Sequence, residues 1–140
     1  MSTATPPPVE RAGHAAFDHA LHGGQGRTSV QFHYADRMNL PVAVQTWTLE
    51  PGASEGLHAH DDPALEEFYL VLAGTALMRL DDEEHTLAAG DALLCPPGSE
   101  HDLRNPGPSP LRVLVVWGPP GQADFSGYAT YRKALAARPG

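Results

Sequence analysis

Apolar and polar residues alternate with a period of two along several short stretches of the chain, which is the pattern of half-buried β-strands. The strongest stretch, residues 42–49, is rich in β-branched and aromatic residues and ends at Pro51-Gly52. Residues 29–34 alternate in the same way and predict an edge strand. Further strands are expected near residues 57–60, 66–73, 75–80, 84–88, 91–95, 101–105 and 111–117. Turn-forming residues separate them, so the pattern predicts an all-β sandwich or barrel, most naturally a jelly roll.

The two ends of the chain depart from this alternation. Residues 1–12 are poor in large apolar side chains, which predicts a flexible or polyproline-like leader. A short helical turn at most is expected before Gly23-Gly24. Residues 124–137 have helical character, with Ser126 as a candidate cap, and predict a short packing helix.

Length and composition limit the classes of protein to consider. A chain of 140 residues has the size of one domain, which we place at residues 13–140 with its core at about 42–118. The formal net charge is −8, and no Lys/Arg cluster is present. Because phosphate neutralisation needs concentrated positive charge, no nucleic-acid partner is expected.

Cysteine usage and the N-terminal residues bear on the compartment. The single cysteine, Cys95, lies in an apolar run before Pro96-Pro97 and predicts a buried residue at the end of a strand. One cysteine forms no internal disulfide, so nothing indicates an oxidising compartment. No signal-peptide pattern and no apolar run of membrane-spanning length occur, so we expect a soluble cytoplasmic protein without a membrane partner.

Two histidines one residue apart, His58 and His60, are the most informative chemical feature. Side chains alternate along a β-strand, so both face the same side and can reach one cation. A helix would set them about 200° apart. Glu67 and His101 add a carboxylate and a third imidazole. Neutral imidazoles and a carboxylate bind divalent ions well, which predicts a metal site.

The spacing around these residues is regular. In the first segment Gly52 is followed by five residues and then His58-Ala59-His60, and Glu67 is followed by six residues and then Gly74. The second segment reads Gly90, five residues, Pro96-Pro97-Gly98, two residues, His101, three residues, Asn105. These segments resemble the two consensus motifs of the cupin superfamily, over roughly residues 45–117. The resemblance implies a small single-domain cupin with a double-stranded β-helix, or jelly-roll barrel.

One feature departs from the cupin pattern. The family has three or four residues between the second histidine and the glutamate, whereas six residues, 61–66, separate His60 from Glu67. Either a short loop is enlarged, or Glu66 or Asp62 binds in place of Glu67. We favour Glu67, because its distance to Gly74 fits the family and because residues 68–72 continue from it as a strand.

The resemblance implies a single divalent metal ion held by His58, His60, Glu67 and His101. Four protein ligands leave one or two positions open on an ion that accepts five or six, unlike a closed structural zinc site. With one carboxylate the centre carries a net charge of about +1, so anionic or vicinal-oxygen small molecules could chelate there. Nitrogen and oxygen ligands do not select among Fe, Mn, Ni, Cu, Co and Zn by affinity alone.

Strand parity identifies further candidate residues. If Glu67 and His101 face the interior, so do Tyr69, Val71 and Leu103. Tyr69 is the candidate catalytic group, because a phenol can act as an acid or hydrogen-bond donor. Gln45 or a backbone carbonyl is expected to accept the second ring proton of a ligating histidine. The pocket is expected to be lined by Gln45, Trp47, Leu49, Leu103 and Asn105.

Five histidines fall outside the motifs and are expected to be surface or hydrogen-bonded residues: His14, His19, His22, His33 and His85.

Two functions remain open on this evidence. The first is a metal-dependent enzyme acting on a small organic molecule, with dioxygenase-like oxidoreductase chemistry slightly preferred over isomerase or cyclase chemistry. The second is a non-catalytic module that uses the same ion to capture a carboxylate or sugar. Small cupins commonly pair through N-terminal strands, so we expect a homodimer formed by residues 28–34 and 42–49, which sedimentation at micromolar concentration would test.

Overall fold

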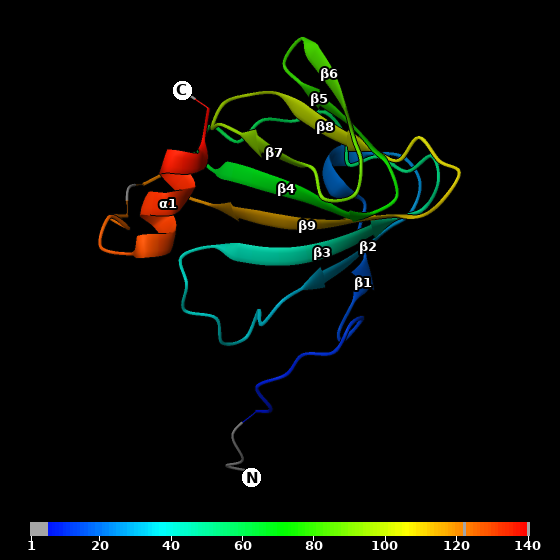
Figure 1. The fold of residues 1–140 in the computed structure, drawn as a ribbon. Coiled ribbons are helices and arrows are strands. Elements are labelled where there is room, and N and C mark those ends of the chain that lie inside the picture. Colours follow the sequence, from blue (N-terminus) through cyan, green and yellow to red (C-terminus); the bar gives the residue numbers. More distant parts are fainter. Residues whose placement is uncertain (1–5, 122, 140) are drawn as a thin grey trace.

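The computed structural model describes residues 6–121 and 123–139. Two antiparallel sheets face each other, and the chain is all-β apart from a 3-10 turn and one short C-terminal helix (Figure 1). The larger sheet has the order β1 (Phe17–Asp18), β2 (Thr28–Phe32), β3 (Ala43–Leu49), β9 (Leu111–Gly118), β4 (Glu66–Ala73), β7 (Ala92–Cys95). The smaller sheet has the order β6 (Glu83–Leu87), β5 (Ala76–Leu80), β8 (His101–Arg104). The predicted jelly-roll class is confirmed.

Strands β3, β9 and β4 form the centre of the larger sheet, and their alternate side chains build the core. Gln45 and Tyr69 both pair with Val115, from opposite sides of β9, and all three side chains are buried. The parity argument is confirmed, since Val71 and Leu103 are also buried. A row of inward residues therefore crosses three adjacent strands and positions polar groups from β3 and β4 over the same interior space.

The predicted strand at residues 57–60 is reduced to one bridge. His58 and His101 exchange backbone hydrogen bonds of 3.0 and 2.8 Å, and no longer ladder forms there among the described residues. The strand predicted at 29–34 is present, but it is not the edge of the sheet. β2 spans Thr28–Phe32 and is covered on its outer side by the two-residue β1.

The 3-10 turn η1 (Leu21–Gly23) packs against the segment that precedes His58. A Cβ on Gly24 would collide with the backbone carbonyl oxygen of Ser54, and a Cβ on Gly56 would collide with that of His22. Glycine at both positions lets two backbones lie in direct contact. The expected helical turn before Gly23-Gly24 is present, and these contacts hold it beside the first motif.

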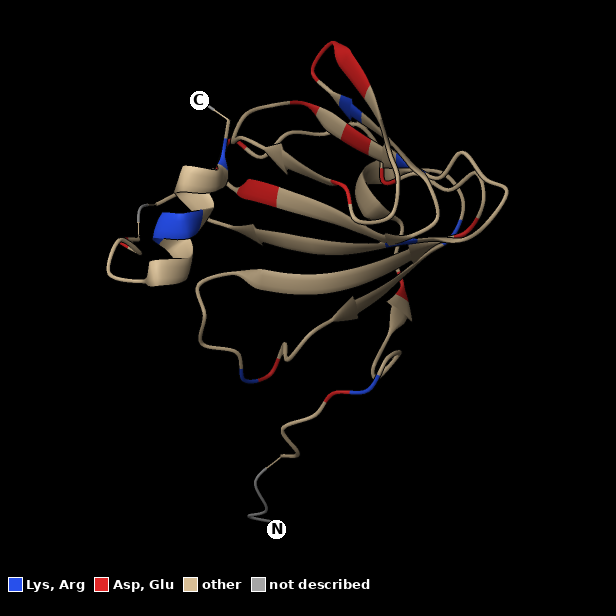
Figure 2. Cartoon of the chain, in the orientation of Figure 1, with Lys and Arg blue, Asp and Glu red and all other residues tan. Residues whose placement is uncertain are grey.

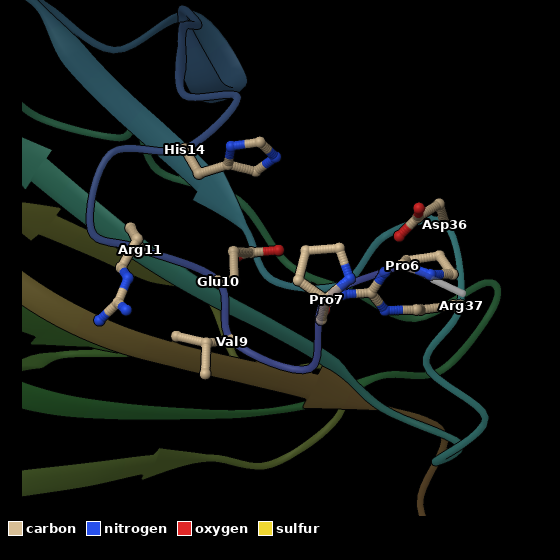
Figure 3. A pocket seen from close by; sticks show the side chains of 8 residues that line it. All are labelled: Pro6, Pro7, Val9, Glu10, Arg11, His14, Asp36 and Arg37. Atoms are coloured by element: carbon tan, nitrogen blue, oxygen red, sulfur yellow. Dashed lines mark hydrogen bonds between the residues drawn. The ribbon is translucent and has the colours of Figure 1, made fainter. Parts of the chain in front are cut away.

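The described part of the leader, residues 6–12, lies along β2 and the turn that follows it. Glu10 accepts hydrogen bonds from the Gln31 amide and the Tyr34 backbone N–H, and it pairs with His33. A hollow of about 530 Å³ opens between this segment and the turn at Asp36 and Arg37 (Figure 3). Its lining contains none of the four predicted metal ligands.

Helix α1 (Ala129–Ala137) closes the described chain and lies at one end of the sheets (Figure 1). Ser126 does not cap it, because Tyr128 occupies the N-cap and makes no side-chain cap bond. None of its residues is buried, so the expected packing role is not realised: Tyr131 and Leu135 are exposed. Within the described ranges, no helix has the length and apolar character needed to cross a membrane.

Candidate metal centre

The structure brings His58, His60, Glu67 and His101 together between the two sheets. One donor atom from each residue can be chosen so that all four lie within 4.8 Å of one another. Glu67 and His101 are each only 2% exposed. Four donors of this chemistry fit a divalent transition metal, because donors about 2 Å from one ion are at most about 4 Å apart and a small closing of the side chains brings every pair within that distance.

Backbone geometry orients two of the imidazoles. Nδ1 of His58 is 2.7 Å from the carbonyl oxygen of Gly56, and Nδ1 of His101 is 3.0 Å from that of Ser99. When Nδ1–H donates to these carbonyls, Nε2 of each ring presents its lone pair to the centre. Of the two predicted acceptors for the second ring proton, the backbone carbonyl is therefore correct and Gln45 is not.

The enlarged gap before Glu67 forms a separate small loop. Asp61 and Ala64 pair through an isolated β-bridge that closes this loop. The Leu65 N–H donates to the His60 carbonyl. Glu67 is thereby restored to register with Cys95 and Trp117. Glu66 points outward and is exposed, and Asp62 is exposed on the loop. Neither alternative carboxylate belongs to the cluster.

Glu67 is the electrostatic centre of the cluster. Its Oε1 lies 3.0 Å from His101 Nε2 and 3.2 Å from His60 Nε2. Burial opposes ionisation of Glu67, but the hydrogen bond and positive charge of His101 outweigh it and lower the pKa of the carboxyl. His58 differs, because burial lowers the pKa of its imidazole to about 4. His58 is therefore neutral at physiological pH and ready to bind an ion.

Tyr69 is buried too deeply for the predicted catalytic role. Its hydroxyl is 2.8 Å from Glu67 Oε2 and 2.8 Å from Glu55 Oε1, and the side chain is fully buried. It does not line the cavity that reaches the donors. The phenol can therefore hold Glu67 in place, but it does not face a bound molecule.

Sequence reasoning missed Glu55, whose carboxyl group is 0% exposed. Burial and the nearby charge of Glu67 raise the pKa of this carboxyl well above its usual range. Its Oε2 has no hydrogen-bond partner among the described residues and lies 3.9 Å from His58 Nε2. No sequence pattern distinguishes Glu55 from an ordinary loop carboxylate, because its burial depends on Tyr69 from a distant strand.

A cavity of about 430 Å³ opens onto the cluster, and His60 and Glu67 form part of its wall. The predicted pocket residues Gln45 and Trp47 line it, together with His19 and His22. The ring of His22 stacks on that of His58 at 3.5 Å between centroids. His22 was expected to be an ordinary surface histidine, and its sequence neighbours give no indication of this stacking.

Three predicted pocket residues lie elsewhere. Leu49 and Leu103 are fully buried in the packed core, outside the cavity lining. The Asn105 amide donates to the carbonyl oxygens of Leu49 and Ser109, so this residue fixes the turn after β8. All three side chains are buried, as inward parity predicted for Leu103, but parity does not give the depth of a residue along the barrel. Cys95 is buried as expected, and burial raises the pKa of its thiol to about 12.

Metal loading should weaken as the solution is acidified. Burial by itself lowers the pKa of His101, but the hydrogen bond to Glu67 outweighs it and raises the pKa above its ordinary value. The ring must lose this proton before Nε2 binds an ion, so apparent affinity should fall about tenfold per pH unit below the raised pKa. Calorimetry at about pH 6, in buffers that differ in ionisation enthalpy, should detect a released proton. Binding without proton release would contradict the assignment.

A protein-family model described as a Cupin domain matches residues 45–117, a little over half of the chain. The chain belongs to the cupin family. The part of this cupin that matches contains all four candidate metal ligands, whereas β1 and η1 lie outside it. The cavity wall formed by His19 and His22 is therefore an addition to the matched domain.

Known proteins similar to this cupin share its fold or its central sequence. Uncharacterized protein MJ1618 from Methanocaldococcus jannaschii is 38% identical over 69 residues, which cover 49% of this chain and 54% of that protein. This cupin thus matches about half the length of that relative. A crystal structure of a predicted oxalate decarboxylase from Thermotoga maritima has a TM-score of 0.69 at 24% identity, covering 75% of this chain and 92% of that one.

A third similar protein is a sugar phosphate isomerase of the cupin superfamily from Silicibacter pomeroyi. Its crystal structure has a TM-score of 0.59 at 26% identity and covers 66% of this chain and 60% of that chain.

Proposed function

We propose that this cupin is a metal-dependent enzyme that acts on a small organic molecule, with dioxygenase-like chemistry. The observation that supports the proposal is the opening of a partly buried three-histidine, one-glutamate cluster onto a cavity of about 430 Å³. A structural metal site needs no such cavity, whereas a reactive site needs access to open coordination positions. A divalent ion bound there would supply Lewis-acid or redox activation of a molecule held through its oxygen atoms.

The residues of the chain contribute orientation and exclusion of water. His58 and His101 are fixed by backbone carbonyls, and Tyr69 holds the second oxygen of Glu67 at 2.8 Å. Donors held rigidly in this way would keep a bound ion in a fixed place beside the cavity, because loosely held ligands lose catalytic geometry. The aromatic walls exclude water from the reacting groups and strengthen electrostatic interactions inside the cavity.

Isomerisation of a sugar phosphate, the chemistry named for the Silicibacter pomeroyi protein, is disfavoured by charge. No Lys or Arg belongs to the cavity lining in the described part of the chain. Figure 2 shows the basic residues scattered over the ribbon, while acidic residues gather on the β5–β6 hairpin. A phosphate dianion would therefore enter this site without a basic partner, which is costly.

Oxygen uptake separates an enzyme from a binding module. After anaerobic reconstitution with each candidate divalent ion, a panel of hydroxy acids, carboxylic acids and phenols is added in air. We expect at least one metal form to consume oxygen, His101→Ala to abolish that activity, and His85→Ala, a surface control, to retain it. Tight metal-dependent binding without turnover of any compound would contradict the enzyme and favour the module that captures a carboxylate or sugar.

A further inference from the structure

The Gln45 side chain carries a buried hydrogen-bond donor that has no acceptor among the described residues. Gln45 is 4% exposed, and its Oε1 accepts a 3.1 Å hydrogen bond from the Trp47 indole N–H. An indole nitrogen only donates, so this contact fixes which end of the amide is oxygen. The other end, Nε2, has no partner among the described residues. An unsatisfied buried donor destabilises the fold and needs an explanation.

Gln45 lies on the wall of the same cavity that His60 and Glu67 border. In the sheet, β9 separates β3 from β4, so the backbones that carry Gln45 and Glu67 are two strand spacings apart, about 10 Å. Both side chains point inward from these strands. A molecule that binds the ion through one end and fills the cavity therefore reaches the Gln45 side chain, whose Nε2 is buried and must turn toward the cavity to donate.

Apart from His19 and His22, the remaining walls of the cavity are apolar. Large hydrocarbon and aromatic side chains dominate the lining: Phe17, Leu21, Val30, Phe32, Trp47 and Trp117. Apolar walls with a few convergent polar groups are typical of small-molecule sites, and here the polar groups are the metal cluster, the imidazoles of His19 and His22, and Gln45. The chemistry of the cavity thus has three parts, namely a cationic centre, an apolar middle and a neutral donor.

We propose that Gln45 recognises a neutral oxygen atom of the substrate, and that the substrate is an oxyacid with an aromatic or similarly apolar body. Its chelating oxygens bind the ion, its ring packs among the apolar walls, and a hydroxyl, ether or carbonyl oxygen accepts a hydrogen bond from Gln45 Nε2. This inference rests on the proposed function, because the chelating end requires the metal. It adds the substrate class and a specificity-determining residue.

A graded set of α-hydroxy acids tests each part of this inference in the metal-loaded protein. Lactate has only the chelating end, mandelate adds a phenyl ring, and 4-methoxymandelate adds a distal neutral oxygen. By calorimetry, affinity should rise from lactate to mandelate to 4-methoxymandelate, the last step by about 2- to 12-fold for one hydrogen bond. Glucose 6-phosphate should bind more weakly than mandelate.

Two variants test whether Gln45 causes the gain in affinity from mandelate to 4-methoxymandelate. Gln45→Glu keeps an acceptor for the Trp47 indole but removes the donor, and Gln45→Met removes both. In both variants 4-methoxymandelate should lose its advantage over mandelate, so the two acids should bind with equal affinity. Thr46→Val, on the opposite face of β3, should retain the wild-type preference.

The outcomes are distinguishable. If the protein binds no metal at the cluster, the proposed function fails and the inference fails with it. If the metal binds but no hydroxy acid binds in a metal-dependent way, only the substrate class is overturned. If mandelate binds through the metal but wild type shows no preference for the methoxy compound, only the role of Gln45 is overturned. Retention of that preference in Gln45→Glu also overturns it. Tighter binding of lactate or glucose 6-phosphate than of mandelate overturns the substrate class.

Discussion

Replacing Glu67 with glutamine should weaken metal binding on the order of 100-fold or more, because even the loss of an outer partner of a ligand costs up to this amount. The substitution keeps the shape of the side chain and removes its charge. Glu67 Oε1 lies 3.0 Å from His101 Nε2 and 3.2 Å from His60 Nε2, so it is the acceptor shared by two of the three imidazoles. Competition against a chelator of known affinity gives the measurement.

The matched control is Glu66→Gln, one residue away on β4. Glu66 faces outward and is exposed, so this variant should bind the ion as the unmodified protein does. This pair of variants tests which carboxylate beside the enlarged gap binds the ion. If Glu66→Gln or Asp62→Asn lost the ion while Glu67→Gln kept it, the assignment of the carboxylate ligand would be overturned.

Gly24→Ala should displace the segment that forms one wall of the cavity. A Cβ at this position would collide with the carbonyl oxygen of Ser54, which is rigid backbone. Overpacking of this kind costs about 1–3 kcal/mol. Relief of the collision moves η1 outward, and the Leu21 and His22 side chains move with it. Mandelate affinity should fall about tenfold, whereas metal affinity should change little, since all four donors lie outside this segment.

Gly127→Ala is the matched control, because a Cβ there meets nothing within 4 Å. It should leave mandelate affinity, metal affinity and thermal stability unchanged. Wild-type mandelate affinity in Gly24→Ala would show that η1 is not part of the working site. Loss of metal from Gly24→Ala would show that the turn supports the centre itself.

The fold and the metal cluster could be predicted because both depend on local regularities. Alternation fixes which side of a strand a residue faces, and the His58-Ala59-His60 spacing places two donors on one side. The same rule could not give depth along the barrel, which is why Leu49 and Leu103 were expected in the pocket and lie in the core. Depth depends on how far each strand extends and on which residues fill the interior around it.

Glu55 and His22 could not be found in this way, because their roles arise from contacts between distant segments. Glu55 is buried in hydrogen-bond contact with the Tyr69 hydroxyl, which is 14 residues away. His22 reaches His58 only because glycines at 24 and 56 allow two backbones to touch. Neither contact leaves a periodic or spaced signal in the sequence.

The central claim is that His58, His60, Glu67 and His101 hold one divalent ion at the end of the cavity. Anomalous diffraction from crystals of the metal-loaded protein tests it most directly. The account predicts one strong peak at about 2.0–2.2 Å from a nitrogen of each histidine and an oxygen of Glu67. A peak at another site, or no peak near these residues at saturating metal, would contradict it.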